Sequence, residues 1–181
     1  MERRVQFPLP APNVTEVTIN GQKVTSKIHK QTMKYMHTNI IAKDWRKLAD
    51  FYIKVFECKE TSSERNLFGD WLEKGTGVKN AKLRGMHLVL PGYEKDEPTL
   101  EIFQYEEMED KLPPVANRMG IGHLCFSVDD VKAVQEKMIE NGGQKIGEVV
   151  SKDYGSGTLV FTYAADPEGN IIEIQNWEPK K

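Results

Sequence analysis

Between residues 35 and 108, the hydrophobic and polar positions alternate first with the period of a strand and then with that of a helix. The stretch "YMHTNIIA" predicts a strand, and "KDWRKLADFYIKVFE" predicts an amphipathic helix with Asp44 at its N-cap. The helix's apolar face comprises Trp45, Leu48, Phe51, Tyr52 and Val55. A short strand near "CKETSSE", a polar loop rich in Gly and Lys, and strands in "AKLRGMHLVLP" and "TLEIFQYE" follow. The pattern predicts a βαβββ unit.

The same order of elements returns after a linker at residues 109–118, whose Pro113 and Pro114 break both helices and sheets. "GIGHLCFSV" predicts a strand, and "DDVKAVQEKMIENGG" predicts a helix that begins after Asp129 or Asp130. Strands are expected at "QKIGEVVS", "GTLVFTYAA" and "NIIEIQNW", with "DPEG" as the last turn. Residues 119–181 therefore predict a second βαβββ unit.

Residues 1–34 differ from both units. "NVTEVTINGQKVTSKIH" places β-branched residues on both sides of an Asn20-Gly21 step, which predicts a β-hairpin. Three roles are open for this extension: an arm on a neighbouring subunit, a lid, or a decoration of a sheet edge.

Overlaying the two units aligns His37 with His123 and Glu101 with Glu173. Taken singly, a strand histidine is more often hydrogen-bonded or exposed than a ligand, and such a glutamate usually lies on a solvated face. The repeat changes this interpretation. Packed about a pseudo-twofold axis, the units would bring together two imidazoles and two carboxylates, a donor set that suits a divalent metal.

Composition narrows the function classes. The 181 residues are enough for one domain with a hydrophobic core. The chain has 25 basic and 27 acidic residues, a net charge of -2, and this balance is not basic enough to indicate nucleic-acid binding. Apolar runs are strand-sized, far below the ~20 residues of a membrane helix. The first ten residues contain no apolar signal segment. A cytoplasmic protein is expected, in which Cys58 and Cys125 are buried thiols.

The tandem units, with "HTNII", "TLEIFQY", "GIGHLCFSVDDV" and "YAADPEGNIIEIQNW", resemble the vicinal oxygen chelate superfamily, which includes glyoxalases, bleomycin resistance proteins and extradiol dioxygenases. The resemblance covers residues 35–177. It implies an α+β fold in which the two units form an incomplete, mostly antiparallel barrel around a divalent ion of nickel, zinc, cobalt, manganese or iron. The implied metal ligands are His37, Glu101, His123 and Glu173, a set similar to those of bacterial glyoxalase I and methylmalonyl-CoA epimerase.

This ligand set implies a metal-dependent lyase or isomerase that removes a proton next to a carbonyl through an enediolate-type intermediate. Glu173 is the expected base, with Glu101 sharing or replacing that role. Two alternatives are a resistance-type protein that sequesters a ligand and a ring-cleaving dioxygenase. The expected partners are a small-molecule substrate and a second copy of the chain, without nucleic acid or membrane. The barrel closes either within one chain or across the dimer.

Residues that contact the substrate are harder to predict from sequence. Three cations flank predicted strands near the site, although a solvated side chain is the simpler interpretation of each: Arg84, Arg118 and Lys152. Cys125 shares the strand face of His123, and Tyr105 shares the face of Glu101, so both are expected to line the pocket. His87 lies off the repeat pattern and is predicted to be a core or surface residue.

Overall fold

The computed structural model describes residues 14–19, 22–27, 33–61, 63–95 and 97–180. The chain divides into two compact units, Met1–Tyr35 and Met36–Lys181. In the first unit, β1 (Val14–Ile19) pairs with β2 (Gln22–Lys27) as an antiparallel hairpin. The Asn20-Gly21 step on which the hairpin prediction rests lies outside the described residues.

The first βαβββ sequence forms a five-stranded sheet in the order β3-β7-β6-β4, with β5 also pairing with β6. Its elements in chain order are β3 (His37–Ile41), α1 (Trp45–Phe56), β4 (Lys59–Glu60), β5 (Arg65–Phe68), α2 (Asp70–Thr76), β6 (Lys82–Val89) and β7 (Thr99–Tyr105). Only the β3–β7 pair is parallel.

Two of these elements, β5 and α2, occupy the segment predicted as a polar loop, so that prediction was wrong. Glycines with positive φ lie at both ends of α2, Gly69 and Gly77. The helix is too short to show a clear apolar period, and it buries only Leu72. Its stability therefore depends on the sheet that Leu72 contacts.

The second βαβββ sequence forms another five-stranded sheet, in the order β10-β11-β12-β8 with β9 paired to β11. Its elements are β8 (Leu124–Ser127), α3 (Val131–Glu140), β9 (Gln144–Lys145), β10 (Val150–Asp153), β11 (Gly157–Ala165) and β12 (Ile171–Pro179). Only the β8–β12 pair is parallel. The segment predicted as one strand at 144–151 is two short strands, and His123 lies immediately before β8.

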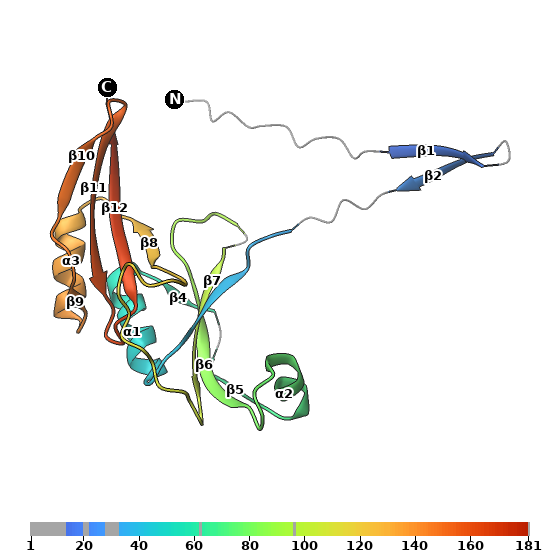
Figure 1. Ribbon diagram of the computed structural model, residues 1–181, viewed down its shortest axis with the longest axis horizontal. Coiled ribbons are helices and arrows are strands. Elements are labelled where there is room, and N and C mark those ends of the chain that lie inside the picture. The colour runs from blue at the N-terminus through green and yellow to red at the C-terminus, as the bar shows by residue number, and fades with distance from the viewer. Residues whose placement is uncertain (1–13, 20–21, 28–32, 62, 96, 181) are drawn as a thin grey trace. The chain divides into compact units, whose positions relative to one another are not determined.

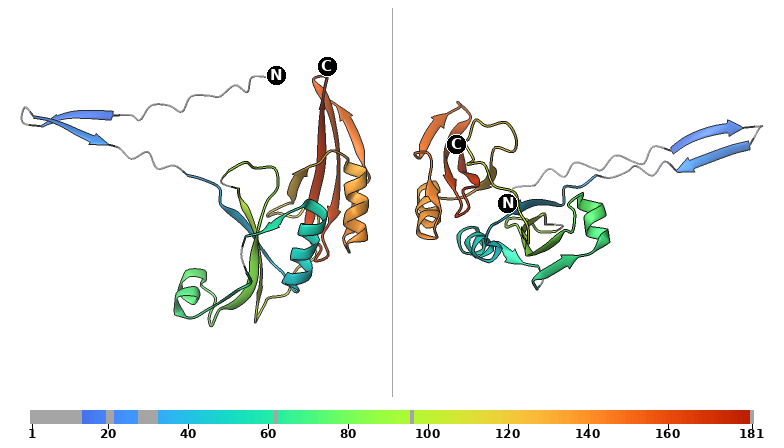
Figure 2. Two further views of the ribbon diagram at one scale, coloured as in Figure 1. Left: turned by 180° about the vertical axis from the view of Figure 1, so that it is seen from behind. Right: turned by 60° about the horizontal axis from the view of Figure 1, so that its bottom comes forward.

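Each sheet is covered on one face by one long helix, and the two helices contact each other (Figure 1). In the right-hand view of Figure 2, α1 and α3 lie side by side next to their sheets. Asp44 and Asp130 cap these helices by accepting hydrogen bonds from backbone N–H groups three residues later, at 3.1 and 3.0 Å. The α+β class with two βαβββ units is confirmed, but both sheets are open and neither closes into a barrel.

One hydrophobic core runs through both βαβββ units. Phe56 of α1 stacks on Phe126 of β8, with ring centroids 4.0 Å apart and planes 16° from parallel. Beside this stack, the Tyr52 hydroxyl of α1 donates a 3.0 Å hydrogen bond to Asp166, in the turn before β12. Because these contacts bury the helix-covered face of each sheet, only the opposite faces remain for a binding site.

Asp166 organises the "DPEGN" turn from inside the protein. Its carboxylate is fully buried and also accepts hydrogen bonds from the backbone N–H groups of Glu168 and Asn170 and from the Asn170 side-chain amide. Burial raises the pKa of this carboxyl despite these donors. Glu168 in turn accepts a 2.8 Å hydrogen bond from the backbone N–H of Asp44, so the turn is joined to the start of α1.

We expect Tyr52→Phe to destabilise the protein by about 1.5–3 kcal/mol, since it removes a hydrogen bond to a buried carboxylate without creating a large cavity. The free energy of unfolding in urea measures the loss. Tyr154→Phe is the matched control, because Tyr154 is 62% exposed. Equal stability of the two variants would show that the Tyr52–Asp166 contact does not help to hold the two βαβββ units together.

Candidate functional site

The first candidate half-site lies on the face of the first sheet opposite α1, where parallel β3 and β7 run side by side. The Nε2 atom of His37 is 3.5 Å from Oε2 of Glu101, and the Asn39 side-chain amide donates a 3.3 Å hydrogen bond to the same oxygen. The Glu101 side chain is 15% exposed and that of His37 47%. The carboxylate is thus largely withdrawn from water, and the imidazole lies at the rim.

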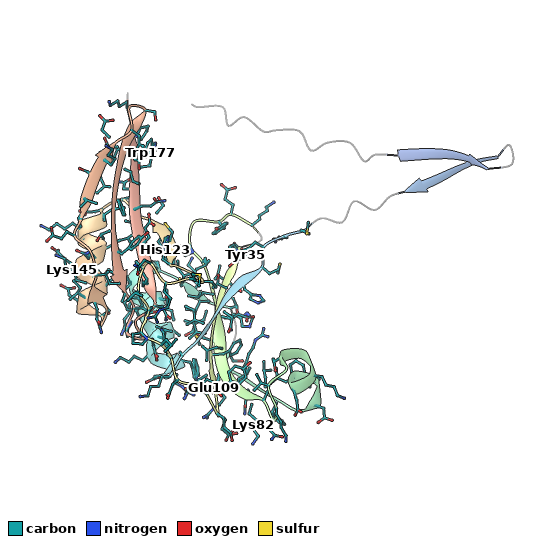
Figure 3. All side chains as sticks on the ribbon, in the orientation of Figure 1. Tyr35, Lys82, Glu109, His123, Lys145 and Trp177 are labelled. Atoms are coloured by element: carbon teal, nitrogen blue, oxygen red, sulfur yellow. The ribbon has the colours of Figure 1, made fainter. Side chains whose placement is uncertain are left out.

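The second half-site repeats this arrangement on the second sheet. Nε2 of His123 is 3.0 Å from Oε2 of Glu173, and the two side chains are 31% and 15% exposed. The parallel β8–β12 pair sets the register here, as β3–β7 does in the first sheet. His123 lies between the linker and β8 (Figure 3). Trp177 lies near the C-terminal end of β12, away from His123.

Opposite each glutamate, the neighbouring antiparallel strand contributes a second polar ring. His87 of β6 is in register with Glu101, and its Nε2 is 3.0 Å from Oε1 of that glutamate. Tyr163 of β11 is in register with Glu173, and its hydroxyl experiences the charge of that carboxylate. Burial, and then the charge of Glu173, raise the pKa of Tyr163, so its hydroxyl remains a donor at neutral pH.

Cys125 is the second-sheet counterpart of Asn39, since each is in register with the glutamate of its sheet. The prediction of a buried thiol was wrong for Cys125, which is exposed, whereas Cys58 is buried. Leu124 and Phe126 of the same strand pack against the core, and period-two alternation therefore turns Cys125 outward. Partial desolvation, and then the nearby Glu173 charge, raise the pKa of the Cys125 thiol.

The donor atoms of each pair have spacings that suit a shared metal ion. Two ligands that each lie ~2.0–2.2 Å from one ion are about 3.0–3.5 Å apart at octahedral to tetrahedral angles. The His37–Glu101 and His123–Glu173 distances, 3.5 and 3.0 Å, fall in this range. Neutral imidazole and carboxylate are also ordinary ligands of divalent transition metals. Both pairs fit a metal, each as half of a coordination shell.

The four side chains do not form one cluster within the described part of this chain. No group of three or more His, Cys, Asp or Glu side chains there is placed to bind one metal ion. The uncovered face of the second sheet is also rich in half-buried apolar side chains, including Leu159 and Phe161, with Trp177 45% exposed. These side chains form an exposed apolar patch beside the His123–Glu173 pair.

The predicted substrate-contacting residues lie on different faces and segments relative to these pairs. Tyr105 shares the site face of β7 and packs against the small cluster formed by Leu72, Ala81, Leu83 and Phe103. Lys152 is in register with Leu159 on the site face of the second sheet, at the β10 edge. By strand alternation, Arg84 projects from the other face of β6, away from His87 and the site. The Arg118 guanidinium donates to the Pro113 carbonyl oxygen within the linker.

A broad groove of about 1840 Å³ runs along the linker between β3 and the turn before β12. Asn39 and His123 line it, but neither glutamate does. Lys111 crosses from the linker to Asn170 and the Glu168 carbonyl oxygen. The groove thus borders the half-sites, and His123 is the one of the four predicted ligands that lines it.

His87 and Tyr163 are the site-face residues that sequence reasoning missed. Neither belongs to the repeated His and Glu positions, and His87 was predicted to be a core or surface residue. A signal does exist in the sequence, because "MHLVL" and "TYAAD" each place one polar ring in an apolar strand before the glutamate strand. Only the antiparallel register shows that both rings lie opposite a glutamate.

The described helices include none with the length and apolar character needed to cross a membrane. Among curated proteins, a lactoylglutathione lyase of Escherichia coli O157:H7 is 27% identical over 147 residues, covering 78% of this chain and 91% of that protein. A probable lactoylglutathione lyase of Synechocystis is 31% identical over 62 residues, 34% of this chain and 46% of that protein.

Solved structures show the same fold. A glyoxalase family protein from Bacillus cereus superposes with a TM-score of 0.66 at 18% identity, covering 86% of this chain and 99% of that one. A glyoxalase I variant from Zea mays gives a TM-score of 0.54 at 20% identity, with 78% of this chain matching 44% of the maize chain. The model of one family matches residues 34–174, and the chain belongs to this family, the Glyoxalase/Bleomycin resistance protein/Dioxygenase superfamily.

Proposed function

We propose that this protein is a divalent-metal-dependent lyase or isomerase of the glyoxalase type. It removes a proton from the carbon next to a carbonyl and returns the proton to the neighbouring carbon or to the opposite face. The observation that carries the proposal is the repeated His–Glu pair, His37 with Glu101 and His123 with Glu173, on the faces of the two sheets opposite α1 and α3.

Each pair supplies one nitrogen and one oxygen ligand, and a stable site needs more. We propose that two chains form a homodimer in which the first sheet of one copy faces the second sheet of the other. The pairs of different copies then complete one site, and each dimer holds two. The half-buried apolar side chains beside Glu173 support this arrangement, since an isolated chain leaves them partly in water.

A bound divalent ion would polarise two neighbouring substrate oxygens and stabilise the negative charge that develops when the carbon-bound proton leaves. Glu173 accepts that proton and later returns it. His123, just before β8, contacts the Glu173 carboxylate, and Tyr163 of β11 lies in register with it, so the base is oriented before the substrate arrives. Such orientation lowers the entropic cost of reaching the reactive geometry.

The proposed substrate class is a small molecule with two vicinal oxygens, one of them a carbonyl, such as a hemithioacetal or an acyl thioester. Similarity to lactoylglutathione lyases supports the hemithioacetal. Lys152 is the predicted cation that shares the site face of the second sheet, and we propose that it binds a substrate carboxylate or phosphate.

Elemental analysis of the purified protein tests this function. We expect about one nickel, zinc, cobalt, manganese or iron ion per chain, with turnover of a hemithioacetal or an acyl-thioester epimer that a chelator abolishes. A ligand-sequestering protein would instead contain no stoichiometric metal and keep its ligand affinity in chelator. Iron with oxygen-dependent cleavage of a catechol would identify a ring-cleaving dioxygenase, and either result would refute the proposal.

A further inference from the structure

The two glutamates of the site are held by different partners. Glu101 has contacts at both oxygens, with His87 at Oε1 and with His37 and Asn39 at Oε2. A carboxylate offers only acceptors, so Nε2 of His87 carries the proton of the 3.0 Å contact. Oε1 is therefore occupied by a ring from the protein, while Oε2 faces the rim where His37 lies.

The His87 ring is held by two neighbouring rings as well as by Glu101. Its side chain is 15% exposed, it meets the Phe103 ring edge to face at a centroid distance of 5.6 Å, and it meets the His37 ring at 6.5 Å. Gly85, in register with Phe103, makes room for this packing. A Cβ on Gly85 would lie 2.5 Å from Cδ1 of Phe103 and closer still to the Ile102 carbonyl oxygen. The backbone of β6 is thus shaped around the ring that supports His87.

His87 is not placed as a third metal ligand beside His37 and Glu101. Among the described residues, no three His, Cys, Asp or Glu side chains are arranged to share an ion. Nε2 of His87 contacts Oε1 of Glu101, whereas Nε2 of His37 contacts Oε2, so the two rings address different oxygens of the carboxylate. A side chain that binds one oxygen of a ligating carboxylate orients the other oxygen toward the metal.

We propose that His87 is a positioning residue: it binds Oε1 of Glu101 and so presents Oε2 to an ion shared with His37. This inference rests on the proposed function, since it requires that the site binds a metal. It assigns different roles to the two glutamates. Glu101 is a fixed ligand, whereas Glu173 is the carboxylate that exchanges protons.

Titration of metal-free protein with Co²⁺ tests the proposal, with the affinity and the visible absorption spectrum as readouts. We expect His87→Phe, which keeps a ring beside Phe103 but removes the donor, to weaken Co²⁺ binding by about 10–100-fold. His87→Gln can donate from its amide and should recover most of the affinity. The cobalt spectrum of the loaded His87→Gln protein should match that of wild type, because the ligands are unchanged.

Met86→Leu is the matched control. Met86 precedes His87 in β6 and is buried on the opposite side, and a volume-conserving change there should leave Co²⁺ affinity unaltered. Thermal unfolding checks that every variant is folded. Unchanged affinity in a folded His87→Phe protein, or an altered cobalt spectrum in His87→Gln, would overturn the positioning role alone. Wild-type protein that binds no Co²⁺ would overturn the proposed function and this inference together.

Discussion

Replacing Glu173 by glutamine is expected to abolish exchange of solvent deuterium into a bound hemithioacetal or acyl-thioester substrate. The amide cannot accept the carbon-bound proton, and loss of a general base lowers the rate by about 10²–10⁴-fold. Glutamine keeps the length and one oxygen of glutamate, so the variant should retain part of its metal. Proton NMR of the substrate in deuterated buffer measures the exchange, and elemental analysis measures the retained metal.

Glu101→Gln is the matched control for this experiment, because it makes the same chemical change at the equivalent position of the other sheet. We expect weaker metal binding, with exchange recovered when metal is added in excess. If the outcomes are reversed, so that Glu173→Gln exchanges deuterium and metal-saturated Glu101→Gln does not, then Glu101 is the base.

Mixing two inactive variants is expected to restore activity if each site is built from two chains. His37→Ala destroys the first half-site of every chain, and His123→Ala destroys the second. In a heterodimer of the two, one site loses both histidines and the other keeps all four ligands. Random reassociation of equal amounts should therefore recover about a quarter of the wild-type sites, since half of the dimers are mixed and each has one intact site.

The control for this mixing experiment uses two variants of the same half-site, His37→Ala with Glu101→Ala. Every heterodimer of that pair has a damaged first half at both sites, so neither metal content nor turnover should return. Recovery in both mixtures would indicate contamination or a ligand set different from the proposed one. No recovery in the first mixture, with dimers shown by light scattering, would place the complete site within one chain.

The Tyr52–Asp166 contact gives the sequence feature "DPEGN" a structural explanation. The turn resembles a family motif, yet its aspartate lies in the core, where it accepts hydrogen bonds from α1 and from its own turn. Glu173, three residues after this turn, is then placed at a fixed position along β12. The motif is informative about the site because it sets where β12 begins.

Much of the fold was predictable because its signals are local. The periods of α1 and α3, the aspartates at their N-caps and the alternation in β7, β11 and β12 depend on residues a few positions apart. Helix α2 and strand β5 were not predictable in this way. Both elements are short. Strand β5 is stabilised by pairing with β6, and α2 by packing of its Leu72 against Leu83 and Phe103 of the first sheet.

The sequence by itself determined the family resemblance, the two βαβββ units and the repeated His and Glu positions, since repeats and periodicities can be recognised in a sequence without knowing how the chain packs. The tertiary structure alone decided that His37 and Glu101 form one pair, that His123 and Glu173 form another, and that the pairs do not share one cluster among the described residues of a chain. It also placed His87 and Tyr163 against the glutamates. Strand register decides such contacts, and register depends on hydrogen bonds between segments that are distant in the chain.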